Sequence, residues 1–160
     1  MPIATFNSEG SNPRWLVIND GVMGGMSRSK FTFDPKGFAV FEGCVSLENG
    51  GGFTMAKKAM DKMSTHAYSK VVLHVKGDGK RYQFRLKSER RQMHSYVCRF
   101  STTGEWEEVS IAFQDLCPAF RGRKLDMACY SGDTLEEIGI LIGNRAQEEF
   151  RLLIKEIRLE

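Results

Sequence analysis

The residues that could perform acid–base or nucleophilic chemistry are few and scattered along the chain. The three histidines, His66, His74 and His94, have no acid or nucleophile at a recognisable motif distance. The paired carboxylates are Glu107-Glu108, Glu136-Glu137 and Glu148-Glu149. Adjacent residues of a strand point to opposite faces, so none of these pairs can act together on one bond. We therefore predict that the protein is not an enzyme.

Cofactor and metal motifs are also lacking in the sequence. The run Gly77-Asp78-Gly79-Lys80 has neither the full spacing of a phosphate-binding loop nor a following helix. Asp-Gly between two alternating strands instead predicts a hairpin turn. Asp20 and Asp78 are the two carboxylates considered for calcium, but no acidic loop of EF-hand type surrounds them. The sequence predicts no cofactor and no metal site.

The four cysteines are irregularly spaced. Cys44, Cys98, Cys117 and Cys129 form no Cys-x-x-Cys unit, and no histidine lies at zinc-finger spacing. Free thiols are the rule in a reducing compartment. We predict that all four are reduced in the native protein.

A polar strand face is the strongest candidate for binding. In the segment 81–88, Tyr82, Phe84 and Leu86 alternate with polar residues, which places Gln83 and Arg85 together on the other face. We expect Arg99 to lie across from Arg85 on the neighbouring strand. Two arginines and a glutamine on one sheet face can hold a carboxylate, a phosphate or sugar hydroxyls. The alternative is an ordinary solvated surface.

A second candidate lies near the amino terminus, where Asn19 and Asp20 follow an apolar run. The two side chains could present polar groups at a binding rim, or Asp20 could accept hydrogen bonds from the backbone of its own turn. The neighbouring residues predict a structural corner in which two apolar side chains close one end of a core and glycines reverse the chain. These corner residues are Trp15, Gly21, Met23, Gly24 and Gly25.

The elements that would position these residues are mostly short strands. The segments 31–33 and 38–41 flank an Asp-Pro-Lys-Gly turn and predict a hairpin. The apolar run 138–142 predicts a strand buried on both faces. Helical spacing in 57–65 permits one helical turn, and 133–137 resembles a brief helix start. Short strands without a long helix favour an all-β sandwich.

Two finer expectations follow from the same patterns. The apolar alternation of the last strand slips by one residue, which predicts a β-bulge near Lys155-Glu156. Apolar positions on these faces or beside glycine turns should be buried. They are Trp15, Phe41, Phe53, Phe84, Phe113, Ile140 and Ile154.

Length and composition restrict the class of protein. With 160 residues, 41% of them hydrophobic, the chain is long enough for one packed core, and we expect a single domain over residues 1–160. The net charge is only +3, and the basic clusters match no nucleic-acid-binding motif. We expect no membrane span and see no signal peptide. These features indicate a bacterial cytoplasmic protein, or a mitochondrial one if a presequence has been removed.

Several blocks of the chain resemble the complex I intermediate-associated protein family. The first is the Trp15-to-Ser27 stretch, with Asn-Asp, Gly-Val-Met-Gly-Gly and Ser. Later blocks that are similar to the family are Phe41-Glu42-Gly43, Glu48-Asn49-Gly50-Gly51-Gly52-Phe53, Val75-Lys76-Gly77-Asp78-Gly79-Lys80-Arg81-Tyr82, Trp106-Glu107-Glu108-Val109, Phe120-Arg121-Gly122-Arg123 and Ile138-Gly139-Ile140. The chain departs from the family at Leu116-Cys117-Pro118, where an aromatic residue is more frequent.

The resemblance implies a jelly roll of the galactose-binding-like type. It also implies a non-enzymatic assembly factor whose partners are respiratory complex I subunits or assembly intermediates. A second interpretation is a carbohydrate-binding module that binds a glycan on its concave face, because the fold is similar to that of family-eleven carbohydrate-binding modules. Exposed aromatic residues on that face would support the second interpretation.

Overall fold

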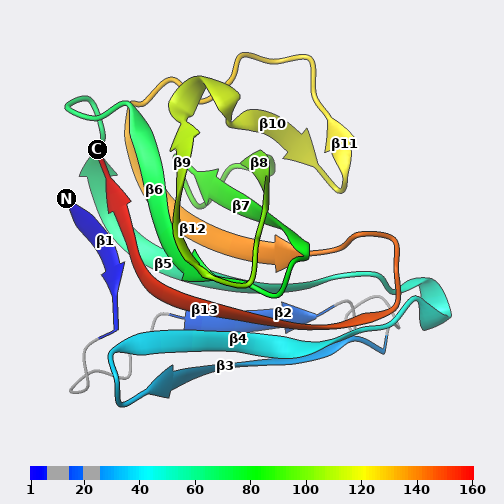
Figure 1. The fold of residues 1–160 in the computed structure, drawn as a ribbon. Helices are drawn as coiled ribbons and strands as arrows, with labels where there is room; N and C mark the ends of the chain where they lie inside the picture. Colours follow the sequence, from blue (N-terminus) through cyan, green and yellow to red (C-terminus); the bar gives the residue numbers. More distant parts are fainter. Residues whose placement is uncertain (7–14, 20–25) are drawn as a thin grey trace.

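A computed structural model describes residues 1–6, 15–19 and 26–160, which form two antiparallel β-sheets packed face to face (Figure 1). Asp20 and the corner residues Gly21, Met23, Gly24 and Gly25 lie outside the described residues. The all-β sandwich expected from the sequence is confirmed.

The first sheet runs in the order β3-β4-β13-β6-β9, and β1 also pairs with β13. Its strands are β1 (Pro2–Thr5), β3 (Arg28–Asp34), β4 (Phe38–Val45), β6 (Lys70–Lys76), β9 (Trp106–Ala112) and β13 (Glu148–Leu159). The two chain ends lie side by side, because the N–H of Leu159 donates to the carbonyl oxygen of Met1 at 2.8 Å (Figure 1).

The second sheet runs in the order β11-β10-β8-β7-β12-β5-β2. Its strands are β2 (Trp15–Asn19), β5 (Thr54–Ser64), β7 (Arg81–Lys87), β8 (Ser95–Ser101), β10 (Cys117–Phe120), β11 (Arg123–Lys124) and β12 (Thr134–Ile142). The helical elements of the described residues are the short 3-10 turns η2 (Glu48–Gly50) and η3 (Phe113–Asp115).

The hairpin at residues 34–37 and the bulge expected from the sequence are both present, but the hairpin expected at Gly77-Asp78-Gly79 was wrong, because this turn connects β6 of the first sheet to β7 of the second. Strands β3 and β4 pair from Arg28 opposite Cys44 to Asp34 opposite Phe38, and Gly37 closes the turn at a φ of +94°. On β13, the register with β6 shifts between Ile154 and Glu156. This shift confirms the predicted β-bulge.

Both helical expectations were wrong, because each segment is strand. Residues 57–64 continue β5, and β12 begins at Thr134. The two segments pair with each other, from Ile142 opposite Thr54 to Thr134 opposite Ser64, with one register shift between Leu135 and Glu137. A long-range ladder of backbone hydrogen bonds therefore overrides the local helical spacing.

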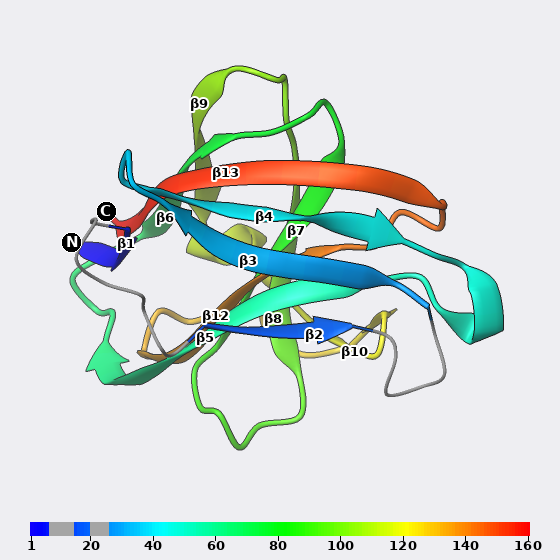
Figure 2. The same cartoon turned by 90° about the horizontal axis from the view of Figure 1, so that it is seen from below.

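The core lies between the sheets. Six of the seven residues expected to be buried are buried, and Phe53, which directly precedes β5, is only half-buried. At one edge of the sandwich, the indole of Trp15 on β2 stacks on Phe31 of β3 with ring centroids 4.4 Å apart. Figure 2 views the edge where β2 and β3 lie alongside each other. Trp15 therefore joins the two sheets, as its expected structural role requires.

Candidate binding face

The alternation of β7 decides which side chains face away from the core. Tyr82, Phe84 and Leu86 are almost fully buried between the sheets. Gln83 and Arg85 therefore project from the opposite side, which we call the outer face of the second sheet.

Two rows of side chains cross this outer face from β2 to β8. The first row contains Ile18, Met55, Leu141, Gln83 and Arg99, each opposite the next across neighbouring strands. The second row contains Leu16, Lys57, Gly139, Arg85 and Val97 in the same strand order. The structure thus brings Gln83, Arg85 and Arg99 onto one face, together with five aliphatic or thioether side chains.

The expected pairing of Arg99 with Arg85 was wrong by two residues. Arg99 lies opposite Gln83, whereas Arg85 lies opposite Val97. A shift of two residues keeps a side chain on the same face of a strand, so the face was predicted correctly although the register was not. The two guanidinium groups are diagonal neighbours instead of direct ones.

Arg85 is a largely enclosed charge of this face. Burial lowers the pKa of its guanidinium, and the nearby carboxylate of Glu137 acts in the opposite direction. Arginine stays charged at neutral pH, because its ordinary pKa is above about 12. Glu137 itself pairs with Lys57, whose Nζ lies 3.5 Å from its Oε1. Within the part of the chain that the structure describes, Arg85 has no ion pair.

Apart from Lys57, the rest of the two rows is apolar but not aromatic. Leu16 is 59% exposed and is followed by Lys57 and Gly139 before Arg85, whereas Met55 and Leu141 lie between Ile18 and Gln83. Gly139 stands directly beside Arg85, so no side chain covers the guanidinium from that position. The result is a shallow apolar surface with a charged group set into it.

An exposed aromatic cluster lies on the other side of the sandwich. Trp106 of β9 is 38% exposed and contacts Phe38 and His74, with ring centroids 5.7 and 5.5 Å from its own. His74 lies on the side away from the core, as its position in the sequence indicated. These rings belong to the outer face of the first sheet and cannot contact a ligand on the second.

Asn19 lies between the sheets and not on the outer face. Its Oδ1 accepts hydrogen bonds from the hydroxyls of Ser29 at 2.9 Å and Thr54 at 2.5 Å. Thr54 is fully buried, so this cluster joins β2 and β5 to β3. The side chain of Asn19 therefore has a structural role. Its neighbour Asp20, outside the described residues, remains a predicted rim residue.

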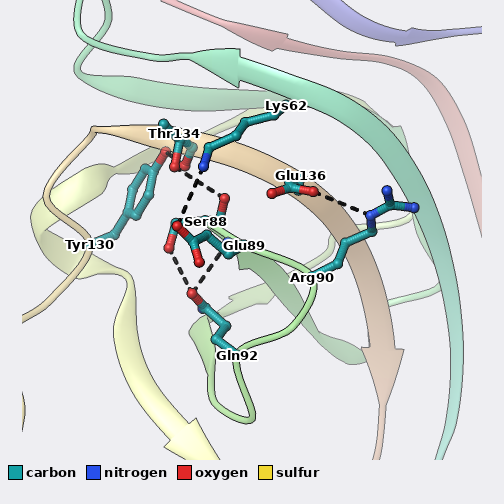
Figure 3. A network of polar contacts seen from close by, with 8 residues as sticks. All are labelled: Lys62, Ser88, Glu89, Arg90, Gln92, Tyr130, Thr134 and Glu136. Atoms are coloured by element: carbon teal, nitrogen blue, oxygen red, sulfur yellow. Dashed lines mark hydrogen bonds and ion pairs between the residues drawn. The ribbon is translucent and has the colours of Figure 1, made fainter.

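A polar network fixes the loop that follows β7 at one end of the outer face (Figure 3). Ser88 donates to Gln92 at 2.7 Å, and Thr134 donates to the carbonyl oxygen of Ser88 at 3.1 Å. Two ion pairs, Lys62–Glu89 at 3.4 Å and Arg90–Glu136 at 3.3 Å, connect the same loop to β5 and β12. The loop therefore holds a defined position beside the face.

A second hollow, of about 730 Å³, lies on the outer face of the first sheet. Its charges largely neutralise one another, because Glu42 pairs with Lys30 at 3.4 Å and with Arg151 at 3.3 Å. Among the described residues, no group of three or more His, Cys, Asp or Glu side chains could hold a metal ion. None of the helical turns described is long and apolar enough to cross a membrane.

Comparison with known families decides the relationship. The family model of Complex I intermediate-associated protein 30 (CIA30) matches residues 4–154. The chain belongs to the CIA30 family. No curated protein sequence matches this CIA30 chain.

Solved structures similar to this CIA30 chain are carbohydrate-binding jelly rolls. A family 11 carbohydrate-binding module of Clostridium thermocellum, bound to a β-1,3-1,4-mixed-linked tetrasaccharide, superimposes with a TM-score of 0.65. It is 13% identical, and the match covers 97% of this chain and 93% of that one. The module of the cellulosomal cellulase Lic26A-Cel5E gives a TM-score of 0.66 at 12% identity over 98% and 92%. At these identities the likeness shows the fold, and the galactose-binding-like jelly roll is confirmed.

Sequence reasoning missed half of the outer face of this CIA30 chain. Lys57 was assigned to a helical turn, and Glu137 to a brief helix start. Gly139 and Leu141 belong to the run 138–142, which was predicted to be buried on both faces of the sheet. Leu141, at 7% exposure, is indeed buried. Residues 55–59 read Met-Ala-Lys-Lys-Ala, which does not alternate apolar and polar side chains, so no local pattern marked this part of the face.

Proposed function

We propose that this CIA30 chain is a non-enzymatic binding protein that assists the assembly of respiratory complex I by holding a protein partner on the outer face of its second sheet. The family description supports the complex I role. The observation that carries the choice of face is the enclosed Arg85, which lacks an ion pair within the described residues and has Gly139 and Val97 as its direct neighbours on the adjacent strands.

The chemistry of the face indicates what the partner offers. Leu16 and Met55 would be covered by apolar side chains, and Arg85 would receive a carboxylate from the partner. A carboxylate bound to arginine in two-pronged geometry gives both affinity and orientation. Mixed apolar and arginine contacts are typical of the centres of protein interfaces. We infer that the partner presents an acidic residue flanked by apolar ones.

A pull-down from native extract of the source organism tests the proposal. Tagged wild-type protein should recover complex I subunits, identified by mass spectrometry, and Arg85→Leu should recover far less. Trp106→Ala is the matched control, because its side chain lies on the opposite face. Equal recovery by all three proteins would exclude this face, and the absence of complex I subunits from the wild-type sample would exclude the assembly role.

The alternative is a carbohydrate-binding module, which the fold of the similar structures supports. The two rows of the outer face contain no aromatic ring on which a sugar could stack. We therefore expect no saturable binding of a β-1,3-1,4-mixed-linked tetrasaccharide by isothermal titration calorimetry. Saturable binding that Arg85→Leu removes would favour the carbohydrate-binding function instead.

A further inference from the structure

Two thiols that the binding face does not use lie in van der Waals contact. The Sγ atoms of Cys117 and Cys129 are 3.4 Å apart. Cys117 belongs to β10, and Cys129 lies on the segment that returns after β11. Both residues are half-buried, so the pair is neither sealed in the core nor fully exposed to solvent.

The backbone holds the two segments together at this point. The N–H of Tyr130 donates to the carbonyl oxygen of Leu116 at 3.0 Å, which places the residues next to them, Cys129 and Cys117, opposite each other. On the other side, Cys117 pairs with Val97 of β8. Both cysteines are thus attached to ordered strands.

The side chain of Tyr130 anchors the returning segment from within. Its ring is buried, and its hydroxyl donates to the carbonyl oxygen of Thr134 at 2.7 Å. The same hydroxyl contacts the hydroxyl of Thr65 at 2.7 Å. Because Cys129 directly precedes this anchor, the closeness of the thiols is built into the packing of the loop.

We propose that Cys117 and Cys129 form a reversible intrachain disulfide when the protein meets a small disulfide oxidant such as oxidised glutathione. One cysteine thiolate attacks the oxidant, forms a mixed disulfide with one glutathione and releases the other glutathione as its thiolate. The second cysteine then attacks the mixed disulfide and releases the bound glutathione. Two protein thiols are oxidised, the glutathione disulfide is reduced, and the two protons pass to the glutathione products.

The movement that this reaction requires is small. A disulfide bond is about 2.05 Å long, so the sulfur atoms approach by little more than 1 Å from their present separation. The other thiols compete poorly for the same partner. Cys44 lies on the outer face of the first sheet. Cys98 lies opposite the buried Phe84 on the core side of β8, whereas Cys117 lies opposite Val97 on the outer side.

The closed form changes one end of the outer face of the second sheet. Cys117 lies opposite Val97, which ends the row that contains Arg85. The disulfide would therefore tie the returning segment, up to Cys129, to the rim of this face. The pair forms its bond whatever partner that face binds, so this inference stands apart from the proposed function.

Oxidation rate should depend on pH in a defined direction. The hydrogen bond with the Cys117 thiol raises the pKa of the Cys129 thiol, and partial burial adds to the effect. Only the thiolate attacks a disulfide, so attack by Cys129 should become faster as pH rises.

The test is oxidation of the folded protein by oxidised glutathione, followed by alkylation and peptide mass mapping. We expect the number of alkylated thiols to fall from four to two, with a peptide that links Cys117 to Cys129 and disappears on reduction with dithiothreitol. Cys44→Ser should still lose two thiols, whereas Cys117→Ser should form no intrachain link.

Four outcomes would overturn the inference. They are retention of four alkylated thiols in the wild-type protein, a link from Cys98 to Cys117, a stable glutathione adduct on Cys129, and unchanged loss of thiols in Cys117→Ser. The peptide map of the wild-type protein decides the matter even if the serine variants fold poorly.

Discussion

Replacing Asp78 by alanine should lower the free energy of unfolding by about 3 kcal/mol or more, since hydrogen bonds to a charged group contribute about 1.5–3 kcal/mol each. Its Oδ1 accepts from the hydroxyl of Tyr82 at 2.9 Å and from the N–H of Lys80 at 3.2 Å. Its Oδ2 accepts from the N–H of Arg151 at 2.8 Å. The carboxylate thus ties the β6–β7 turn to β13, and Tyr82 is fully buried beside it.

The expected loss can be measured by thermal and urea unfolding. A change of this size should lower the melting temperature of a chain this long by about 6–12 °C. Asp78→Asn retains one acceptor oxygen and should cost less than Asp78→Ala. Lys80→Ala removes only a partly exposed ion pair, with Nζ 3.6 Å from Oδ2, and should change little. Melting of Asp78→Ala at the wild-type temperature would contradict this role.

Replacing Arg85 by glutamate should weaken binding of the recovered partner by about 30-fold or more, because losing one member of an enclosed charge pair costs about 2–5 kcal/mol. The new carboxylate would also lie near Glu137, which already acts on the guanidinium. Biolayer interferometry with the purified partner measures the change in Kd.

Matched variants separate a binding effect from a folding effect. Arg85→Leu removes the charge but keeps an apolar side chain of similar bulk, so it should also weaken binding while melting close to wild type. Arg99→Glu changes an exposed charge at the rim and should have a smaller effect. Unchanged affinity in Arg85→Glu, with the fold intact, would show that the partner binds elsewhere.

Local patterns in the sequence predicted most of the fold. The alternation of Tyr82, Phe84 and Leu86 placed Gln83 and Arg85 on the correct face, and the period slip located the bulge after Ile154. Each of these features is set by near neighbours in sequence and by the two-residue period of a strand.

Features that depend on long-range pairing were not predictable in this way. Lys57 and Gly139 meet only because β5 pairs with β12, and Arg99 faces Gln83 only because of the β7–β8 register. Helical spacing in 57–65 was a real local signal, but the ladder with β12 outweighed it.

The closeness of Cys117 and Cys129 has the same cause. The β10–β11 pairing sets Ala119 opposite Lys124, whereas the backbone contact of Leu116 falls on Tyr130. The returning segment is therefore three residues longer than a regular continuation of the Ala119–Lys124 pairing would require. This extra length brings Cys129, and not an earlier residue, opposite Cys117. Sequence spacing contains no sign of this shift, so irregularly spaced cysteines gave no reason to expect a pair.

Site-specific photo-crosslinking tests the central claim, that a complex I subunit binds the outer face of the second sheet. A benzoylphenylalanine probe at Gln83 lies between Leu141 and Arg99 in the first row of that face. The same probe at Trp106 lies on the opposite side of the sandwich. The proposed function predicts that irradiation in native extract joins a complex I subunit to the Gln83 probe and not to the Trp106 probe. Crosslinks to complex I from Trp106 alone, or from neither position, would contradict it.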